Sequence, residues 1–196
     1  MGDGSDSIDG GSGFDSAVYF SNISQYSILN SSNKIWTISD VLDSSVDHLQ
    51  DIERIHFTDK SVALDIGAGD TGGSSYRIYK AAFNRTPDEG GLGYWIGQMD
   101  LGMDLVDVSA RFIDSDEFRA AYGTNPSNGE FLTKVYNNVL GRDPDSGGYD
   151  WWVDQLANNP EKSWDKVLAD FSESTENQAN VSELIGNGVQ YDLWVG

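Results

Sequence analysis

The chain has 196 residues, no cysteine, 32 acidic and 12 basic side chains, and a formal net charge of −20. This charge disfavours nucleic acid and anionic membranes, whose phosphates need a basic footprint, and the lack of cysteine excludes disulfides, zinc–thiolate sites and cysteine nucleophiles. The surplus of carboxylates favours calcium as a partner, because hard oxygen ligands suit that ion.

The opening residues carry no targeting signal. Met1 leads into Gly2-Asp3-Gly4, without the basic and apolar regions of a signal peptide. No apolar run approaches the roughly 20 residues of a membrane span. We therefore expect a chain that starts inside a longer protein and has no membrane span.

Two consecutive nonapeptides follow at the N-terminal end. Residues 10–18 fit the pattern G-G-x-G-x-D-x-U-x, where U is apolar, and residues 1–9 fit it from Gly2 onward. Glycines allow a tight turn whose carbonyls point at a cation, the aspartate closes the site, and the apolar residue starts a short strand. The pattern predicts a calcium β-roll; the alternative is a frayed Gly-rich terminus that binds metal weakly. The candidate calcium ligands are Gly4, Asp6, Asp9, Gly11, Gly13 and Asp15.

Residues 17–66 have the pattern of short strands. β-Branched or aromatic runs at 17–20, 26–29 and 35–38 are separated by turn residues, and Ile55 and Phe57 alternate before a turn at Asp59-Lys60. We expect these non-repeating strands to cap the open end of the roll, because an uncapped sheet exposes unpaired edge groups.

This N-terminal part resembles the RTX (repeat-in-toxin) family of secreted bacterial proteins. Besides the nonapeptides, Ile52–Phe57 (I-E-R-I-H-F) is similar to the I-E-R-[LI]-x-F motif that ends repeat blocks in that family. The resemblance implies that each ion lies between loops two repeats apart, so that two repeats supply half-sites unless later residues complete them. It also implies a secreted or cell-surface location.

A Gly- and Ser-rich stretch at 67–75 is the predicted linker, and from Tyr76 onward the apolar residues recur at helical spacing. The predicted fold class is α+β: a short N-terminal calcium β-roll or β-solenoid cap at 1–66, followed by an all-α helical bundle at 76–196, built from similar units at 76–125 and 128–187 with a C-terminal tail. The expected helices are 75–84, 89–100, 104–113, 115–122, 128–140, 146–157, 162–171 and 174–187.

The two helical units share a loop motif, R-x-P-D-x-G-G. Proline ends the preceding helix, the aspartates Asp88 and Asp145 suit the N-cap position, and the arginines Arg85 and Arg142 are placed to pair with a carboxylate. The alternative is a calcium site in the second copy alone. Its candidate ligands are Asp143, Asp145 and Asp154, at positions 1, 3 and 12 of a calcium-loop spacing.

Each motif ends in an aromatic pair, of which one member lies about 100° from the apolar stripe. These members, Tyr94 and Trp151, are candidates for stacking on the sugars of a polysaccharide or cell-surface glycan; the alternative is that they form a second buried face of the helix.

Catalysis is poorly supported by the sequence. The chain has two histidines, both in the strand segment, and neither of the catalytic motifs G-x-S-x-G and H-E-x-x-H. We expect no catalytic residue and no enzyme activity.

The motifs at Phe83–Trp95 and Leu140–Trp152 resemble the bacterial family called domain of unknown function 4214, which often follows RTX repeats. The apolar tail after residue 188 looks like the uncleaved signal of RTX proteins exported by type I secretion; the alternative is a tail that docks on the bundle. The resemblance implies a non-catalytic, calcium-binding C-terminal region whose partners are calcium and the type I secretion machinery. The alternatives are an adhesive carbohydrate-binding module and an accessory domain of a larger extracellular enzyme.

Overall fold

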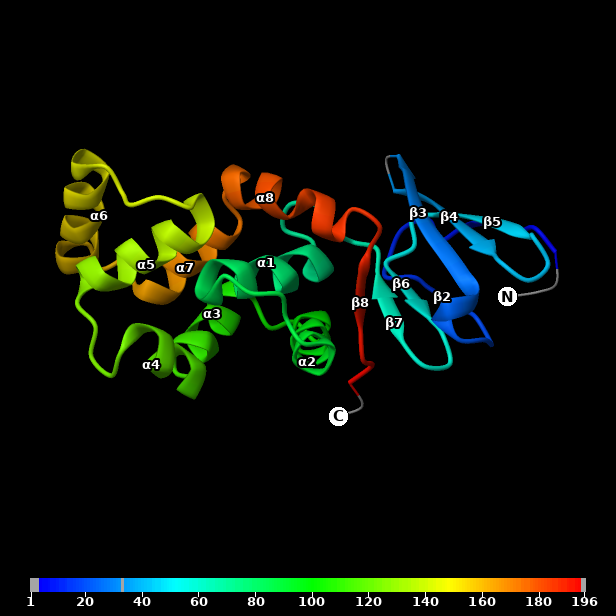
Figure 1. The fold of residues 1–196 in the computed structure, drawn as a ribbon, viewed down its shortest axis with the longest axis horizontal. Coiled ribbons are helices and arrows are strands. Elements are labelled where there is room, and N and C mark those ends of the chain that lie inside the picture. Colours follow the sequence, from blue (N-terminus) through cyan, green and yellow to red (C-terminus); the bar gives the residue numbers. More distant parts are fainter. Residues whose placement is uncertain (1–3, 33, 195–196) are drawn as a thin grey trace. The chain divides into compact units, whose positions relative to one another are not determined.

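The computed structural model describes residues 4–32 and 34–194, and the chain divides into two compact units (Figure 1). The first comprises Met1–Gly73, Asp88–Gly97 and Glu183–Gly196, and the second comprises Ser74–Pro87 and Gln98–Ser182. The described residues form eight α-helices and two four-stranded sheets, so the fold is mixed α+β. Among the same residues, no helix is both long and apolar enough to cross a membrane.

Two small sheets form the centre of the first unit. The parallel pairs are β1 with β5 and β2 with β6, and all other neighbouring strands are antiparallel. One sheet has the order β1 (Ser7–Asp9), β5 (Val46–Gln50), β4 (Ile35–Asp40), β3 (Tyr26–Ser32). The other has the order β2 (Ser16–Val18), β6 (Arg54–His56), β7 (Ser61–Ala63), β8 (Val189–Tyr191).

The nonapeptides supply the first strand of each sheet. In each repeat the three residues after the aspartate form the strand, and the apolar middle residue, Ile8 or Ala17, points toward the core. Ile8 lies opposite Leu49 and Ala17 lies opposite Ile55, so the coil made by β5 and β6 stacks in register on the coil made by β1 and β2. The two parallel strand pairs thus place one short strand of each sheet beside the next coil.

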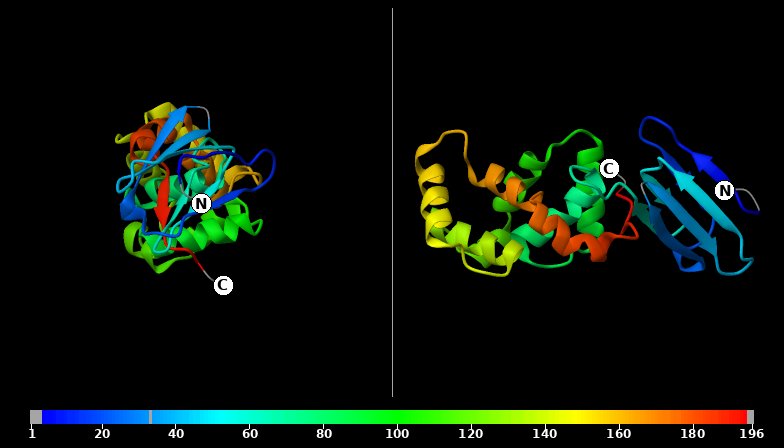
Figure 2. Two further views of the ribbon diagram at one scale, coloured as in Figure 1. Left: turned by 90° about the vertical axis from the view of Figure 1, so that its right-hand side faces the viewer. Right: turned by 90° about the horizontal axis from the view of Figure 1, so that it is seen from above.

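The last strand of this unit comes from the far end of the sequence. Where the sequence predicts an apolar tail, residues 189–191 form β8, antiparallel to β7 (Figure 1, red beside cyan; Figure 2 gives two further views). Val189 and Tyr191 are buried and Gln190 is exposed, which is the period-two pattern of a strand with one buried face. A three-residue alternation is too short to be recognised in the sequence.

The first helix begins inside the predicted linker. Helix α1 starts at Thr71 because Gly72 allows it to approach β7 closely: a Cβ at position 72 would lie 2.6 Å from the Cβ of Ala63 and 2.6 Å from Oδ1 of Asp65. Gly72 therefore serves close packing rather than flexibility, whereas Gly69 has a left-handed φ angle of 76°.

The other expected helices are present within two residues at each end. The helices are α1 (Thr71–Phe83), α2 (Glu89–Asp100), α3 (Leu105–Ile113), α4 (Asp116–Tyr122), α5 (Asn128–Leu140), α6 (Ser146–Asn158), α7 (Trp164–Ser172) and α8 (Thr175–Ile185). This agreement follows from the strong 3.6-residue periodicity of the C-terminal part.

In the second unit, the equivalent helices α3 and α7 of the two sequence copies pack against each other. Their buried residues Val108 and Val167 occupy matching positions. The start of the following helix also matches: Ser115 accepts the N–H of Phe118, and Ser174 accepts the N–H of Asn177. The two sequence copies therefore match in these helices and caps.

Candidate metal centre

The turn between β1 and β2 is built by its glycines. Gly11 and Gly13 have φ angles of 76° and 134°, which side-chain-bearing residues rarely adopt. A Cβ at Gly10 would lie 2.2 Å from the carbonyl oxygen of Asp51 and 3.0 Å from Cγ of Asp15. The glycines thus wrap the turn closely around the Asp15 carboxylate and bring a backbone carbonyl of the next coil beside it.

The Asp15 carboxylate is incompletely satisfied. Its Oδ2 is shielded from solvent and has no hydrogen-bond partner among the residues that the structure describes. A buried carboxylate oxygen without a partner is costly, because the desolvation of its charge is not compensated. A cation held by Asp15 and by backbone carbonyls of the glycine turn would satisfy this oxygen, and hard oxygen ligands of this kind suit calcium.

The turns of both nonapeptides are hydrogen-bonded in the same way to the coil made by β5 and β6. The N–H of Asp6 donates to Oδ1 of Asp47 (2.9 Å), and the N–H of Asp15 donates to Oε2 of Glu53 (2.9 Å). The carbonyl of each aspartate then accepts the N–H of the residue that follows that carboxylate. The coil made by β5 and β6, the capping coil, therefore binds both turns through the carboxylates of Asp47 and Glu53. It has no glycine turn of its own.

Two titratable groups near this coil are held neutral. Burial, followed by the hydrogen bond to Asp47, raises the pKa of the Tyr19 hydroxyl. Burial, followed by the charge of Arg54, lowers the pKa of His56. Neither group therefore adds charge to this part of the first unit at neutral pH.

The remaining N-terminal candidates have local roles. Gly4 has a φ angle of 99°, matching Gly13 in the second repeat, and Oδ1 of Asp9 accepts the N–H of Gly11 (2.9 Å). The first part of the first nonapeptide, residues 1–3, lies outside the described residues.

The three acids of the second-copy loop are not brought together. The chain is helical from Ser146, so Asp154 lies along α6, about 12 Å from its start at 1.5 Å per residue. Asp143 accepts a hydrogen bond from Asn137, and Asp154 accepts one from Asn158. In the described part of the chain no group of three or more His, Cys, Asp or Glu residues is placed to hold a metal. A loop that turns into helix at its fourth residue cannot wrap around an ion as a calcium loop does.

The R-x-P-D-x-G-G motif instead caps the start of the helix that follows it. Oδ1 of Asp88 accepts the N–H of Gly91 (2.7 Å), and Oδ1 of Asp145 accepts the N–H of Gly148 (2.9 Å), so both aspartates cap the next helix. Arg85 pairs with both carboxylate oxygens of Glu117 (2.6 and 2.9 Å).

In the second copy the equivalent arginine keeps the contact with a tyrosine ring, which Arg85 makes with Tyr79 (4.8 Å), but not the carboxylate partner. Arg142 is exposed and lies 6.0 Å from the centre of the Tyr136 ring. Within the described residues it has no carboxylate partner, and Glu176, the counterpart of Glu117, is also exposed.

The two candidate sugar-stacking residues are partly exposed. Trp151 is 53% exposed and packs edge-on against Trp152. Tyr94 is 39% exposed and lies edge-to-face with Trp194, with ring centres 5.5 Å apart. The aromatic pair in the first unit is thus formed by residues 100 positions apart, and sequence reasoning missed Trp194 because nothing local links it to α2.

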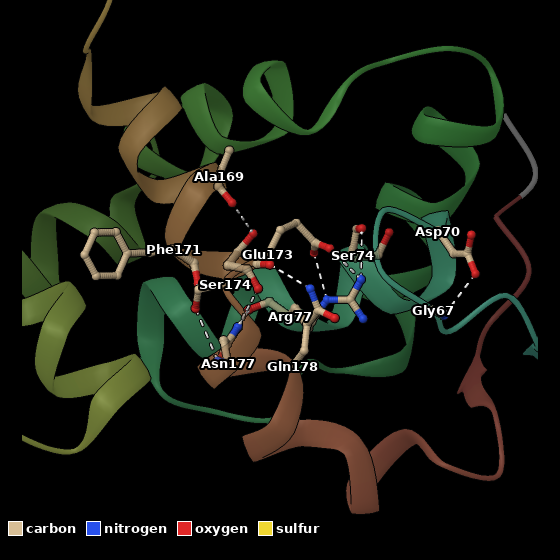
Figure 3. A network of polar contacts seen from close by, with 12 residues as sticks. Gly67, Asp70, Ser74, Arg77, Ala169, Phe171, Glu173, Ser174, Asn177 and Gln178 are labelled. Carbon is tan, nitrogen blue, oxygen red and sulfur yellow. Dashed lines mark hydrogen bonds and ion pairs between the residues drawn. The ribbon is translucent and has the colours of Figure 1, made fainter.

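A buried ion pair in the second unit was also missing from the sequence analysis. Arg77 of α1 donates from Nε and Nη2 to the two carboxylate oxygens of Glu173, both at 2.8 Å, and Asn177 donates to the carbonyl of Arg77 (Figure 3). This network joins α1 to the corner between α7 and α8. The only sequence signal is that Arg77 lies within an otherwise apolar and small stretch of α1.

Comparison with known proteins bears on the helical part. Residues 109–181 match the sequence model of the family described as domain of unknown function (DUF4214), from within α3 to within α8. The match includes the second loop motif at 140–152, while the first, at 83–95, precedes it. No curated protein and no solved structure matches the chain. Residues 109–181 are therefore similar to a family whose description assigns no activity.

Proposed function

We propose that the chain is a non-catalytic calcium-binding C-terminal region of a secreted or surface protein of the RTX type. Calcium would be bound at the turn of residues 10–15 and would order the first unit after export through type I secretion. The helical part would act as a folded interaction module.

The observation that carries the proposal is the unsatisfied, buried Oδ2 of Asp15 inside a glycine turn. Three features support it: the two nonapeptides form strands of a stacked two-sheet coil, the turn glycines have left-handed φ angles, and the net charge is −20. A divalent cation would offset part of the mutual repulsion of the carboxylates.

Calcium titration by isothermal calorimetry on the chelator-stripped full chain tests the proposal. We expect binding in the range of about 10⁻⁴ to 10⁻³ M that is usual for extracellular modules. Because calcium would bind the folded state, 10 mM calcium should stabilise the protein by roughly 1.4 to 2.7 kcal/mol and raise Tm.

Two matched variants assign the site. Asp15→Ala should abolish the heat of binding, whereas Asp145→Ala should keep it and lose about 1 kcal/mol of stability through the missing helix cap. Absence of heat in the unmodified chain, or loss of heat in Asp145→Ala alone, would reject calcium binding at the N-terminal turn.

A second candidate function is glycan binding, favoured by the exposure of Trp151 and by the Tyr94–Trp194 pair. A glycan array should then give hits, and Tyr94→Ala or Trp151→Ala should lower the affinity about tenfold, the effect of one lost aromatic contact. Phe20→Ala, which removes an exposed aromatic of the strand segment, is the control and should bind normally. An array without hits, or equal affinities of all variants, would remove this candidate.

A further inference from the structure

A buried ion pair in the first unit lies between the candidate calcium turn and the start of α1. The Arg54 side chain is almost fully buried and pairs with Asp65, while its Nη1 donates to the carbonyl of Glu53 (2.8 Å). The ring of Phe14, the turn residue before Asp15, covers the guanidinium, with 4.8 Å between its centre and the guanidinium carbon. Both the side chain and the backbone of the turn thus contact this arginine.

On the turn side, Asp15 fixes the backbone of the capping coil. Its carbonyl accepts the N–H of Glu53 (3.0 Å) and the N–H of Arg54 (3.2 Å), and its own N–H donates to Oε2 of Glu53. A cation that immobilises the Asp15 carboxylate would therefore also restrain the position of Arg54.

On the helix side, Asp65 supports a weak first turn. Residues 71–74 of α1 include Gly72 and Gly73, and glycine is a poor helix former. Oδ1 of Asp65 accepts the N–H of Gly72 (3.3 Å), and its carbonyl accepts the N–H of Gly73 (3.0 Å). These amides have no partner within the helix, so the first turn of α1 depends on the position of Asp65.

Building on the calcium binding proposed above, we propose that the Arg54–Asp65 pair couples cation binding at the turn to formation of the first turn of α1. The two states are a formed and a frayed first turn. Calcium at Asp15 favours the formed state, and by reciprocity the formed state binds calcium more tightly. The N-terminal turn then regulates where α1 begins.

Amide hydrogen exchange measured by NMR on the full chain, with and without calcium, tests this coupling. Calcium should slow exchange of the Gly72 and Gly73 amides about tenfold, a usual size for coupling between sites. Phe14→Ala, which removes the exposed ring over Arg54, should lose most of this slowing even at a calcium concentration that saturates the variant. Gly72→Ala, whose added Cβ would press on Asp65 and on Ala63 of β7, should weaken calcium binding by about the same factor.

A control lies in the same unit. Gly90→Ala introduces a Cβ with only ordinary contacts, the nearest at 3.8 Å, and should keep the calcium affinity and the exchange rates at the start of α1. If calcium binds the unmodified chain but leaves the exchange of Gly72 and Gly73 unchanged, the coupling is rejected while the proposed function stands.

If the unmodified chain binds no calcium, the proposed function fails. The hydrogen-exchange measurements made without calcium then test whether the turn and the start of α1 are coupled. There, Phe14→Ala should speed exchange of the Gly72 and Gly73 amides, and Gly72→Ala should speed exchange of the Glu53 and Arg54 amides. Unchanged rates would overturn the coupling, and the Phe14→Ala result alone suffices if Gly72→Ala does not fold.

Discussion

Glu173→Ala is expected to lower the free energy of unfolding by about 3–5 kcal/mol, because it leaves the Arg77 guanidinium buried without its carboxylate partner. The Arg77 side chain is 2% exposed and that of Glu173 is 22% exposed, and the pair is bidentate. Urea unfolding followed by far-UV circular dichroism measures the change.

The first sequence copy offers a matched control. The Arg85–Glu117 pair has the same bidentate geometry, but its side chains are 35% and 44% exposed. Glu117→Ala should therefore cost only about 0–1 kcal/mol, the usual range for surface ion pairs. Similar losses for the two variants would show that burial does not set the strength of the Arg77 pair.

A third variant distinguishes ionic from general packing effects. Arg77→Met combined with Glu173→Leu removes both charges and keeps apolar volume, which is often neutral or stabilising for buried pairs. The double variant should recover most of the stability lost in Glu173→Ala. A double variant as unstable as Glu173→Ala would mean that the side-chain hydrogen bonds of Arg77, including the one it donates to Oγ of Ser74, are needed for stability (Figure 3).

Gly93→Ala is expected to detach the C-terminal strand from the first unit. A Cβ at position 93 would lie 1.8 Å from the carbonyl oxygen of Asp192 and 3.0 Å from its carbonyl carbon, so backbone must move. The expected cost is about 1–3 kcal/mol, the range for overpacking, together with faster hydrogen exchange of the amides in 189–192. Exchange and urea unfolding measure the two effects.

Its control lies one helical turn earlier on the same face of α2. At Gly90 the nearest atoms to an added Cβ are at 3.8 and 3.9 Å, so Gly90→Ala should stabilise the protein by roughly 0.5–1 kcal/mol through helix propensity. The two substitutions should thus have opposite signs. Equal stability of the two variants would show that β8 does not require the glycine at position 93.

The elements with strong periodicity could be predicted from the sequence, and those formed by distant residues could not. The helices followed from apolar residues at i, i+3, i+4 and i+7, and the turn at Asp59-Lys60 followed from its flanking alternation; it joins β6 to β7. The strand β8 has only Val189 and Tyr191 as inward residues, and its partner β7 is itself three residues long.

In the candidate calcium site, too, the residues close in sequence could be predicted and those from a distant coil could not. The spacing of glycine and aspartate predicts that Asp15 lies in the turn, because the conformation of the turn depends on neighbouring residues. The role of Glu53 as acceptor of the Asp15 N–H, and that of Arg54 beneath Phe14, depend on stacking of a coil 38 residues later. In the loop at 143–154 the spacing left a calcium site open as the alternative to a helix cap, and Asp145 caps the helix that starts there.

The sheet order β2-β6-β7-β8 has a consequence for how the chain is made. Ser61 pairs with Tyr191, so the partners are 130 positions apart, and the sheet that begins beside the N-terminal turn stays one strand short until residues 189–191 have left the ribosome. Contacts of such high sequence separation form slowly. The first unit is therefore completed only after residues 189–191 have emerged, and its strand edge at β7 is open to other partners until then.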